Sequence, residues 1–150
     1  MSHTFSHLLF HLVFSTQYRM NLIAPEFRDE LHPYMEGIVK NEGGSVLAIG
    51  GMPDHVHLLV RLKPSLCLSE MLRSLKANSS RWVHERADLP REFAWQEGYG
   101  AFSVSQSSAA SVARYIQTQE KHHRRRSFED EWVTLLKKHG IEFDPAAPFG

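Results

Sequence analysis

The chain has 150 residues, of which 42% are hydrophobic and 23% are charged, as expected for one soluble globular domain over residues 1–150. Its 17 basic and 17 acidic residues balance, which argues against a protein that coats nucleic acid non-specifically. The single cysteine, Cys67, excludes an intrachain disulfide and a zinc site built from cysteines alone. Since neither a signal peptide nor a bilayer-spanning apolar run is present, we expect a cytoplasmic location and no membrane partner.

Hydrophobic periodicity predicts an α+β chain with the order β-α-β-β-α-β, followed by C-terminal helices. The expected strands cover residues 7–15, 45–49, 55–62 and 102–106, and the expected helices cover residues 25–42, 69–86, 108–119 and 128–139. This order is that of the ferredoxin-like, RRM-like split motif, an antiparallel sheet with helices on one face. We therefore expect the other face to be free for a ligand. A hairpin with a longer loop is expected over residues 50–54, and a loosely held tail over about 144–150.

His55 and His57 stand out within an otherwise apolar strand. Side chains two apart on a strand share a face, so both imidazoles project away from the side that carries Val56 and Leu58. Two neutral histidines at this spacing can hold one metal ion. Paired histidines on an exposed sheet surface are the alternative interpretation.

Tyr115 and Gln119 form a second pair, one helical turn apart after the fourth strand. Gln119 offers a neutral oxygen ligand, and Tyr115 offers a nucleophile. Such pairs are also common as plain surface residues. Among the four tyrosines, Tyr115 is the one with a metal-capable neighbour one turn away.

Basic and polar residues gather in two places that are candidates for binding nucleic-acid phosphates. The first is the polar side of the helix expected over residues 69–86, with Arg73, Lys76, Ser80 and Arg81. The second is the basic run over residues 121–126, which includes His122 and His123. A solvated helix face is the alternative for both.

Several stretches, in order along the chain, resemble the single-tyrosine HUH transposases of small bacterial insertion sequences, which include the REP-associated tyrosine transposases. The stretch with the histidine pair is Met-Pro-Asp-His-Val-His-Leu-Leu-Val at residues 52–60. The others are His-Leu-Val-Phe-Ser-Thr at 11–16, Leu-Lys-Ala-Asn-Ser-Ser-Arg-Trp at 75–82, Trp-Gln-Glu-Gly-Tyr at 95–99, Tyr-Ile-Gln-Thr-Gln at 115–119 and His-Gly-Ile-Glu-Phe at 139–143.

The resemblance implies a function and a role for each site residue. His55, His57 and Gln119 would hold Mg²⁺ or Mn²⁺, and Tyr115 would attack a phosphodiester of single-stranded DNA to give a 5′-phosphotyrosine and a free 3′-hydroxyl. It also implies recognition of DNA hairpins, a homodimer, and association with the bacterial nucleoid when DNA is bound. Because imidazole favours softer ions than Mg²⁺, we expect Mn²⁺ to work at least as well.

Two other functions remain open at this point. A catalytically silent, domesticated module would bind single-stranded nucleic acid through stacking and basic side chains. A metal-dependent phosphodiesterase would use the histidine pair to activate water and would tolerate Tyr115→Phe. The first alternative does not require the combined presence of histidine pair, tyrosine and glutamine, because binding alone needs none of that chemistry.

Overall fold

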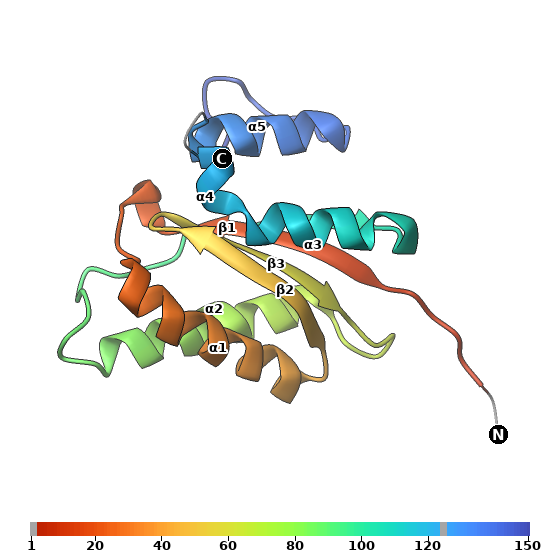
Figure 1. Cartoon of the computed structure of the whole chain (residues 1–150), viewed down its shortest axis with the longest axis horizontal. Helices are drawn as coiled ribbons and strands as arrows, with labels where there is room; N and C mark the ends of the chain where they lie inside the picture. Colours follow the sequence, from red (N-terminus) through yellow and green to blue (C-terminus); the bar gives the residue numbers. More distant parts are fainter. Residues whose placement is uncertain (1–2, 124–125) are drawn as a thin grey trace.

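The computed structural model describes residues 3–123 and 126–150 and has one antiparallel sheet between two layers of helices (Figure 1). The sheet has the strand order β2-β3-β1-β4. The strands are β1 (Leu9–Ser15), β2 (Ser45–Met52), β3 (His55–Arg61) and β4 (Gly100–Val104). The helices are α1 (Pro25–Glu42), α2 (Leu68–His84), α3 (Ala109–Gln117), α4 (Gln119–His123) and α5 (Phe128–Lys138), with 3-10 turns η1 (Gln17–Arg19) and η2 (Gln106–Ser108). The predicted α+β class and element order are confirmed.

α1 and α2 form the layer on one face of the sheet (Figure 1). Pro25 begins α1, a position where the absent N–H of proline has no helical partner to lose. Gly43 ends the helix with φ 102°, a left-handed conformation that glycine adopts without strain. Leu12, Phe14 and Leu58 point from β1 and β3 into this layer and are fully buried. The main hydrophobic core therefore lies on the side away from the histidine pair.

The opposite face of the sheet carries His55 and His57 and is covered by α3, α4 and α5 (Figure 1). The prediction that this face would be free for a ligand is wrong, because both histidines are fully buried. The cause is a second set of apolar contacts. Ile116 of α3 belongs to a cluster with Leu59 of β3, and Phe128 of α5 belongs to another with residues of β1 and β4. A ligand must therefore reach the histidines from the rim of this helical layer.

β2 and β3 form a tight hairpin in place of the expected longer loop. β2 continues to Met52, so Gly50 and Gly51 pair within the sheet, and only Pro53 and Asp54 form the turn. Paired glycines are typical of turns, which is why the sequence favoured one here. Within a strand, glycine marks a place where another backbone comes close.

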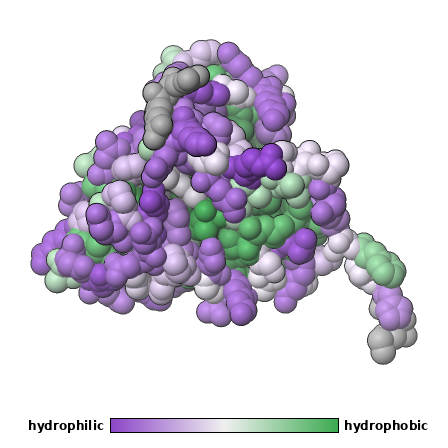
Figure 2. Space-filling view, viewed as in Figure 1, coloured by the Kyte–Doolittle hydropathy of each residue, from purple (hydrophilic) through white to green (hydrophobic). Residues whose placement is uncertain are grey.

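β2 is an edge strand of the sheet, and part of its surface is apolar. Figure 2 shows an apolar patch between α1 and α3, where this strand reaches the surface. Val46 and Ile49 are partly exposed there, and Leu47 is 37% exposed. The patch adjoins the place where α3 crosses β2 at Gly50.

The segment over residues 144–150, expected to be loosely held, is attached to α5. Trp132 donates its indole N–H to the carbonyl of Pro148 at 2.9 Å, and the ring of Phe149 stacks on that of Phe128 with centroids 5.8 Å apart. The guanidinium of Arg19 lies over the Phe149 ring, 4.2 Å from its centroid. No helix within residues 3–123 and 126–150 is long and apolar enough to cross a membrane.

Candidate active site

His55 and His57 lie at the start of β3 and project from the same face of the sheet. Their ring centroids are 5.1 Å apart. Both rings meet a side chain that the sequence did not single out, Glu131 of α5. The Oε1 atom of Glu131 lies 2.9 Å from His57 Nε2 and 3.4 Å from His55 Nε2. The two histidines and this carboxylate are buried and offer ligand atoms that all lie within 4.8 Å of one another.

The Nδ1 atom of each imidazole, on the side away from Glu131, also has a hydrogen-bond partner. Asp54 Oδ1 lies 2.7 Å from His55 Nδ1, and His11 Nε2 lies 2.8 Å from His57 Nδ1. Partners of this kind fix the ring orientation and direct the Nε2 lone pair toward a metal. Burial, followed by the neighbouring His57, lowers the pKa of His11 to about 3, so His11 is neutral. It can accept the Nδ1–H of His57 when a metal ion occupies Nε2 of that ring. Asp54 and His11 are thus positioning groups for the histidine pair.

The charges of the buried histidines and of Glu131 must balance one another, because the cluster is shielded from water. Burial disfavours the charged form of His55, but hydrogen bonds to Asp54 and Glu131 outweigh it and raise its pKa to about 9. Burial lowers the pKa of His57. The three histidine contacts of Glu131 overcome its burial and hold the pKa of that carboxyl well below its usual range. In the absence of a metal, a proton on His55 therefore balances the ionised Glu131.

Tyr115 and Gln119 reach the cluster from α3 and α4. The Tyr115 hydroxyl donates to Oε2 of Glu131, the oxygen not used by the histidines. Gln119 Oε1 lies 3.1 Å from His55 Nε2, and its amide donates to the Tyr115 carbonyl. Thr118 leaves helical geometry between the two, so Tyr115 and Gln119 occupy the ends of two helices rather than one face of a single helix. The structure nevertheless places His55, His57 and Tyr115 around one carboxylate, with Gln119 beside His55.

His123 joins the same cluster, although the sequence suggested a DNA contact. Its Nε2 lies 3.1 Å from both Gln119 Oε1 and Glu131 Oε1, and its ring is 4.6 Å from that of His55. His122 instead lies over the Tyr115 ring at 4.5 Å. His123 is therefore a further potential ligand, and His122 a neighbour of the tyrosine. Arg124 and Arg125 of the basic run lie outside the described residues.

The other predicted DNA contacts lie on α2, on the opposite side of the sheet from the histidines (Figure 1). Arg73 is exposed, Ser80 is partly buried, and Arg81 donates to Asn78. Lys76 turns back into its own chain, where its ammonium lies 2.5–3.1 Å from the carbonyls of residues 96–98. The structure does not bring this group together with the histidine cluster.

Glu131 is the main site residue that sequence reasoning missed, and the sequence does contain a signal for it. The apolar positions of the last helix are Phe128, Trp132, Leu135 and Leu136. Glu131 falls on the same helical stripe, three residues after the first of them. An acidic residue on an apolar stripe requires a partner, because an unpaired buried charge is costly.

Comparisons with known proteins fit this arrangement. The model of a family described as "Transposase IS200 like" matches residues 4–119, which include the histidine pair, Tyr115 and Gln119. The chain belongs to the IS200-like transposase family. The match ends before α5, so Glu131 lies outside the matched segment.

Individual relatives give the same result. This transposase is 28% identical over 117 residues to the ISDra2 transposase TnpA of Deinococcus radiodurans, covering 75% of this chain and 84% of that protein. It is 27% identical over 125 residues to the transposase for insertion sequence element IS200 of Salmonella typhimurium, covering 79% and 81% respectively.

Two solved structures share the fold. One, from D. radiodurans R1 and assigned as a transposase, has a TM-score of 0.63 at 25% identity and covers 77% of this chain and 93% of its own. The other is a REP-associated tyrosine transposase bound to a REP hairpin, with a TM-score of 0.61 at 13% identity, covering 82% and 74%.

The donor set of the transposase fits a divalent transition-metal ion. Two imidazole nitrogens, one carboxylate oxygen and one amide oxygen surround a single buried point, and the outer nitrogens are held by Asp54 and His11. The carboxylate and the amide supply the oxygen atoms that Mg²⁺ and Mn²⁺ prefer, whereas the imidazoles favour the softer Mn²⁺.

Metal binding should stabilise this transposase more at pH 8.5 than at pH 6.5. His55 has a folded pKa of about 9, above its ordinary value of 6.5, so its proton stabilises the metal-free fold below pH 6.5 and this stabilisation is lost as the pH rises toward 9. The effect is on the order of 3 kcal/mol. A metal needs the neutral ring, so it replaces the proton most readily at high pH.

Thermal unfolding with and without Mn²⁺ at the two pH values measures this difference. Asp54→Asn, which removes the charge of one of the two carboxylates that raise the His55 pKa, should reduce the pH dependence. Greater stabilisation by Mn²⁺ at pH 6.5 would contradict the assignment of His55 as a ligand.

Lys76 should contribute to stability more than to DNA binding. Lys76→Met keeps the length of the side chain but removes the charged hydrogen bonds to three carbonyls, and should lower the free energy of unfolding by about 1.5–3 kcal/mol. Arg73→Met, an exposed change on the same helix, should alter it by less than about 0.5 kcal/mol. Urea unfolding measures both values. Unchanged stability with weakened DNA binding in Lys76→Met would show that Lys76 faces DNA instead.

Proposed function

We propose that this transposase cleaves and rejoins single-stranded DNA through a covalent bond to Tyr115, with a divalent metal ion held by His55, His57 and Gln119. The observation that carries the proposal is the shared carboxylate of Glu131. One of its oxygens contacts the two histidines, and the other accepts the hydroxyl of Tyr115. A nucleophile and a set of metal ligands thus meet around one group.

Glu131 extends the ligand set that the family resemblance implies. Its Oε1 lies 2.9 Å from His57 Nε2 and 3.4 Å from His55 Nε2, close enough for one ion to bind all three atoms. Burial and the negative Glu131 carboxylate raise the pKa of Tyr115 well above its usual value, so the phenol keeps its proton in the metal-free protein. A divalent cation bound at the cluster would offset the Glu131 charge and polarise the scissile phosphate.

In the proposed step, the Tyr115 oxygen forms a bond to phosphorus and the bond from phosphorus to the 3′ oxygen breaks. The phenolic proton leaves through Glu131 Oε2, the atom to which the hydroxyl is hydrogen-bonded. The departing 3′ oxygen takes up a proton and becomes a free 3′-hydroxyl. Because the 5′-phosphotyrosine keeps the energy of the broken bond, a later attack by a 3′-hydroxyl rejoins DNA without a nucleotide cofactor.

The DNA would reach Tyr115 through a groove between α3 and α5. This hollow has a volume of about 690 Å³, and Tyr115 and Glu131 line it together with serines of β4 and α3 and with Lys138. Hydroxyl groups and cationic side chains are the usual contacts of a phosphate backbone. We infer that the groove holds the strand next to the scissile phosphate.

A hairpin is the proposed recognition element, as in the related structure bound to a REP hairpin. Within one chain, Gln119 already contacts His55, and Tyr115 contacts Glu131, the carboxylate that both histidines share. A homodimer, which the family resemblance implies, would therefore serve DNA binding rather than complete the site. We propose that the tyrosine acts on its own subunit's histidines.

The covalent mechanism predicts a protein–DNA adduct that requires Tyr115. The transposase is incubated with 3′-labelled single strands from the DNA flanking its gene and Mn²⁺ or Mg²⁺, and the products are separated on denaturing gels. The intact protein should form a labelled adduct, which Tyr115→Phe, His57→Ala or a chelator should reduce at least about 10³-fold. Tyr99→Phe, a change at a partly exposed loop tyrosine, is the matched control and should leave the adduct unchanged.

The other two functions have different signatures in this experiment. Cleavage that survives Tyr115→Phe without an adduct would favour a metal-dependent phosphodiesterase. Tight binding of hairpin strands by the intact protein, with no cleavage in either metal, would favour a silent binding module.

Lys138→Ala should weaken binding of the cleavable single strand several-fold and reduce its dependence on salt by the equivalent of about one phosphate contact. The reason is that Lys138 lines the groove that leads to Tyr115. Lys137→Ala, an equally exposed neighbour that does not line the groove, is the control. Fluorescence anisotropy at several salt concentrations measures the effect. Equal losses in the two variants would indicate non-specific attraction rather than a bound strand.

A further inference from the structure

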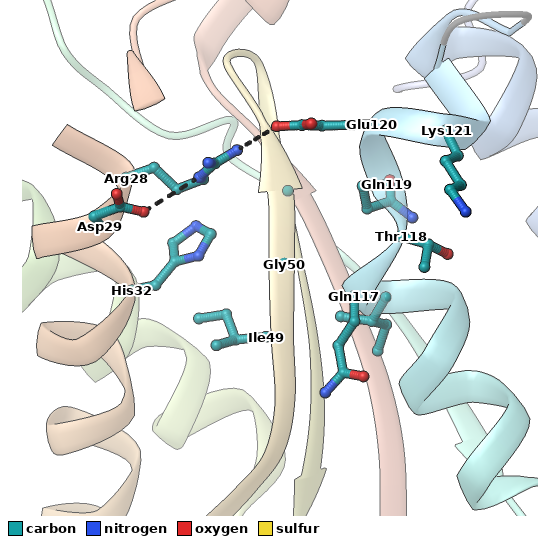
Figure 3. A pocket seen from close by; sticks show the side chains of 12 residues that line it. Arg28, Asp29, His32, Ile49, Gly50, Gln117, Thr118, Gln119, Glu120 and Lys121 are labelled. Carbon is teal, nitrogen blue, oxygen red and sulfur yellow. Dashed lines mark hydrogen bonds and ion pairs between the residues drawn. The ribbon is translucent and has the colours of Figure 1, made fainter. Parts of the chain in front are cut away.

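Gly50, on the edge strand β2, lies between the histidine strand β3 and the end of α3. It pairs directly with His57 of β3, and directly opposed residues of neighbouring strands share a face of the sheet. Gly50 therefore lies beside the second histidine of the pair, on the face covered by α3. Figure 3 shows this glycine on β2, with residues 117–121 on one side and residues of α1 on the other. A hollow of about 470 Å³ opens between these two sides.

The end of α3 rests directly on Gly50. A Cβ atom added at this position would lie 2.1 Å from the carbonyl oxygen of Ile116 and 3.0 Å from its carbonyl carbon. Both are backbone atoms, so no side-chain rotation can relieve the overlap. The φ of Gly50 lies outside the left-handed region, so alanine fits the local backbone of the strand. The close approach of α3, and not the conformation of β2, requires glycine here.

The residue that contacts Gly50 is placed between the two groups that act on the histidines. Ile116 directly follows Tyr115 and precedes Gln119 by three positions. The same contact thus fixes the height above the sheet of both the nucleophile and the amide ligand. Within the sheet, Gly50 is fixed by its pairing with His57 on the neighbouring strand β3.

We propose that Gly50 is a positioning residue, whose missing side chain lets the end of α3 approach the sheet closely enough for Tyr115 and Gln119 to meet His55 and His57. The inference rests on the proposed function, because it assigns Gly50 a role in the reaction of Tyr115. Restoring an ordinary contact above an alanine at this position would lift the end of α3 by about 1 Å. A displacement of that size at a reacting group costs on the order of 10²-fold in rate.

Gly50→Ala should therefore slow the chemical step and spare the binding of DNA. Three quantities are measured with Mn²⁺: the single-turnover rate constant of adduct formation at saturating strand, the Kd of the strand, and the unfolding temperature. We expect the rate constant to fall between about tenfold and 10²-fold, with the Kd changed by less than about twofold. A merely structural role would lower the amplitude of the reaction and the unfolding temperature, not the rate constant.

Two further variants make the outcome decisive. Gly37→Ala, in a helix where nothing lies within 4 Å of the added Cβ, is the control and should leave the rate constant unchanged. Ala48→Val enlarges a buried residue two positions before Gly50 in the cluster that contains Ile116, and should lower the rate constant in the same manner. If Gly50→Ala does not fold, this second variant decides the question by the same criteria.

Failure of the positioning role is distinguishable from failure of the proposed function. If the intact protein forms no Tyr115 adduct with any strand, the proposed function fails. If it forms the adduct and Gly50→Ala or Ala48→Val forms it at the same rate, the positioning role is overturned. A fall in rate that is matched by an equal loss of strand binding would also overturn it and would place Gly50 in a DNA-binding surface.

Discussion

The burial of the Glu131 carboxylate is the constraint on which the histidine face of the sheet depends. An ionised carboxylate removed from water costs several kcal/mol unless it is paired and hydrogen-bonded. α5 can therefore pack over β3 only where imidazoles meet that carboxylate. His55, His57 and His123 do so, from β3 and α4. Conversely, the two histidines can lie inside an apolar strand only because a partner reaches them, and one side chain satisfies both requirements.

The same group couples the stability of the fold to the chemistry. Oε2 of Glu131 accepts the Tyr115 hydroxyl, so the position of this proposed nucleophile depends on how α5 docks. The apolar residues that dock it, including Phe128 stacked on the His55 ring with centroids 4.1 Å apart, belong to the same helix as the carboxylate. Any change that loosens the packing of α5 moves Glu131. It therefore disturbs both the proposed metal site and the hydrogen bond that positions Tyr115. The metal-free cluster keeps its charge balance through a proton, which a cation at the same point would displace.

Much of the fold and part of the site could be predicted from the sequence. The alternation of apolar residues in β1 and β3 and the helical spacing of apolar residues after Pro25 are local signals. The family resemblance grouped the histidine pair with Tyr115 and Gln119. Glu131 and the role of Gly50 could not be found in this way, because each depends on a contact between elements distant in the chain. Glu131 meets its partners 74 and 76 positions away, and Gly50 meets Ile116. From the sequence alone, Gly50-Gly51 indicates a turn. Only the position of α3 against β2 shows that the glycine is needed for close packing.

The covered histidine face also bears on the kind of DNA that the site admits. Tyr115 is partly buried between α3 and α5, and its hydroxyl points inward to Glu131 rather than to solvent. In the proposed reaction, a scissile phosphate would have to enter the groove between these helices to reach it. A duplex would bring its paired strand to the rims of the groove, whereas a single strand could bend and present one phosphate to Tyr115, which is why the proposal names single-stranded DNA. The break at Thr118 adds a second condition, since it turns Gln119 toward His55 while Tyr115 stays above Glu131. In the proposed reaction, the metal ion and the attacking oxygen would therefore approach the phosphate from neighbouring positions, with Gln119 beside His55 and Tyr115 beside Glu131.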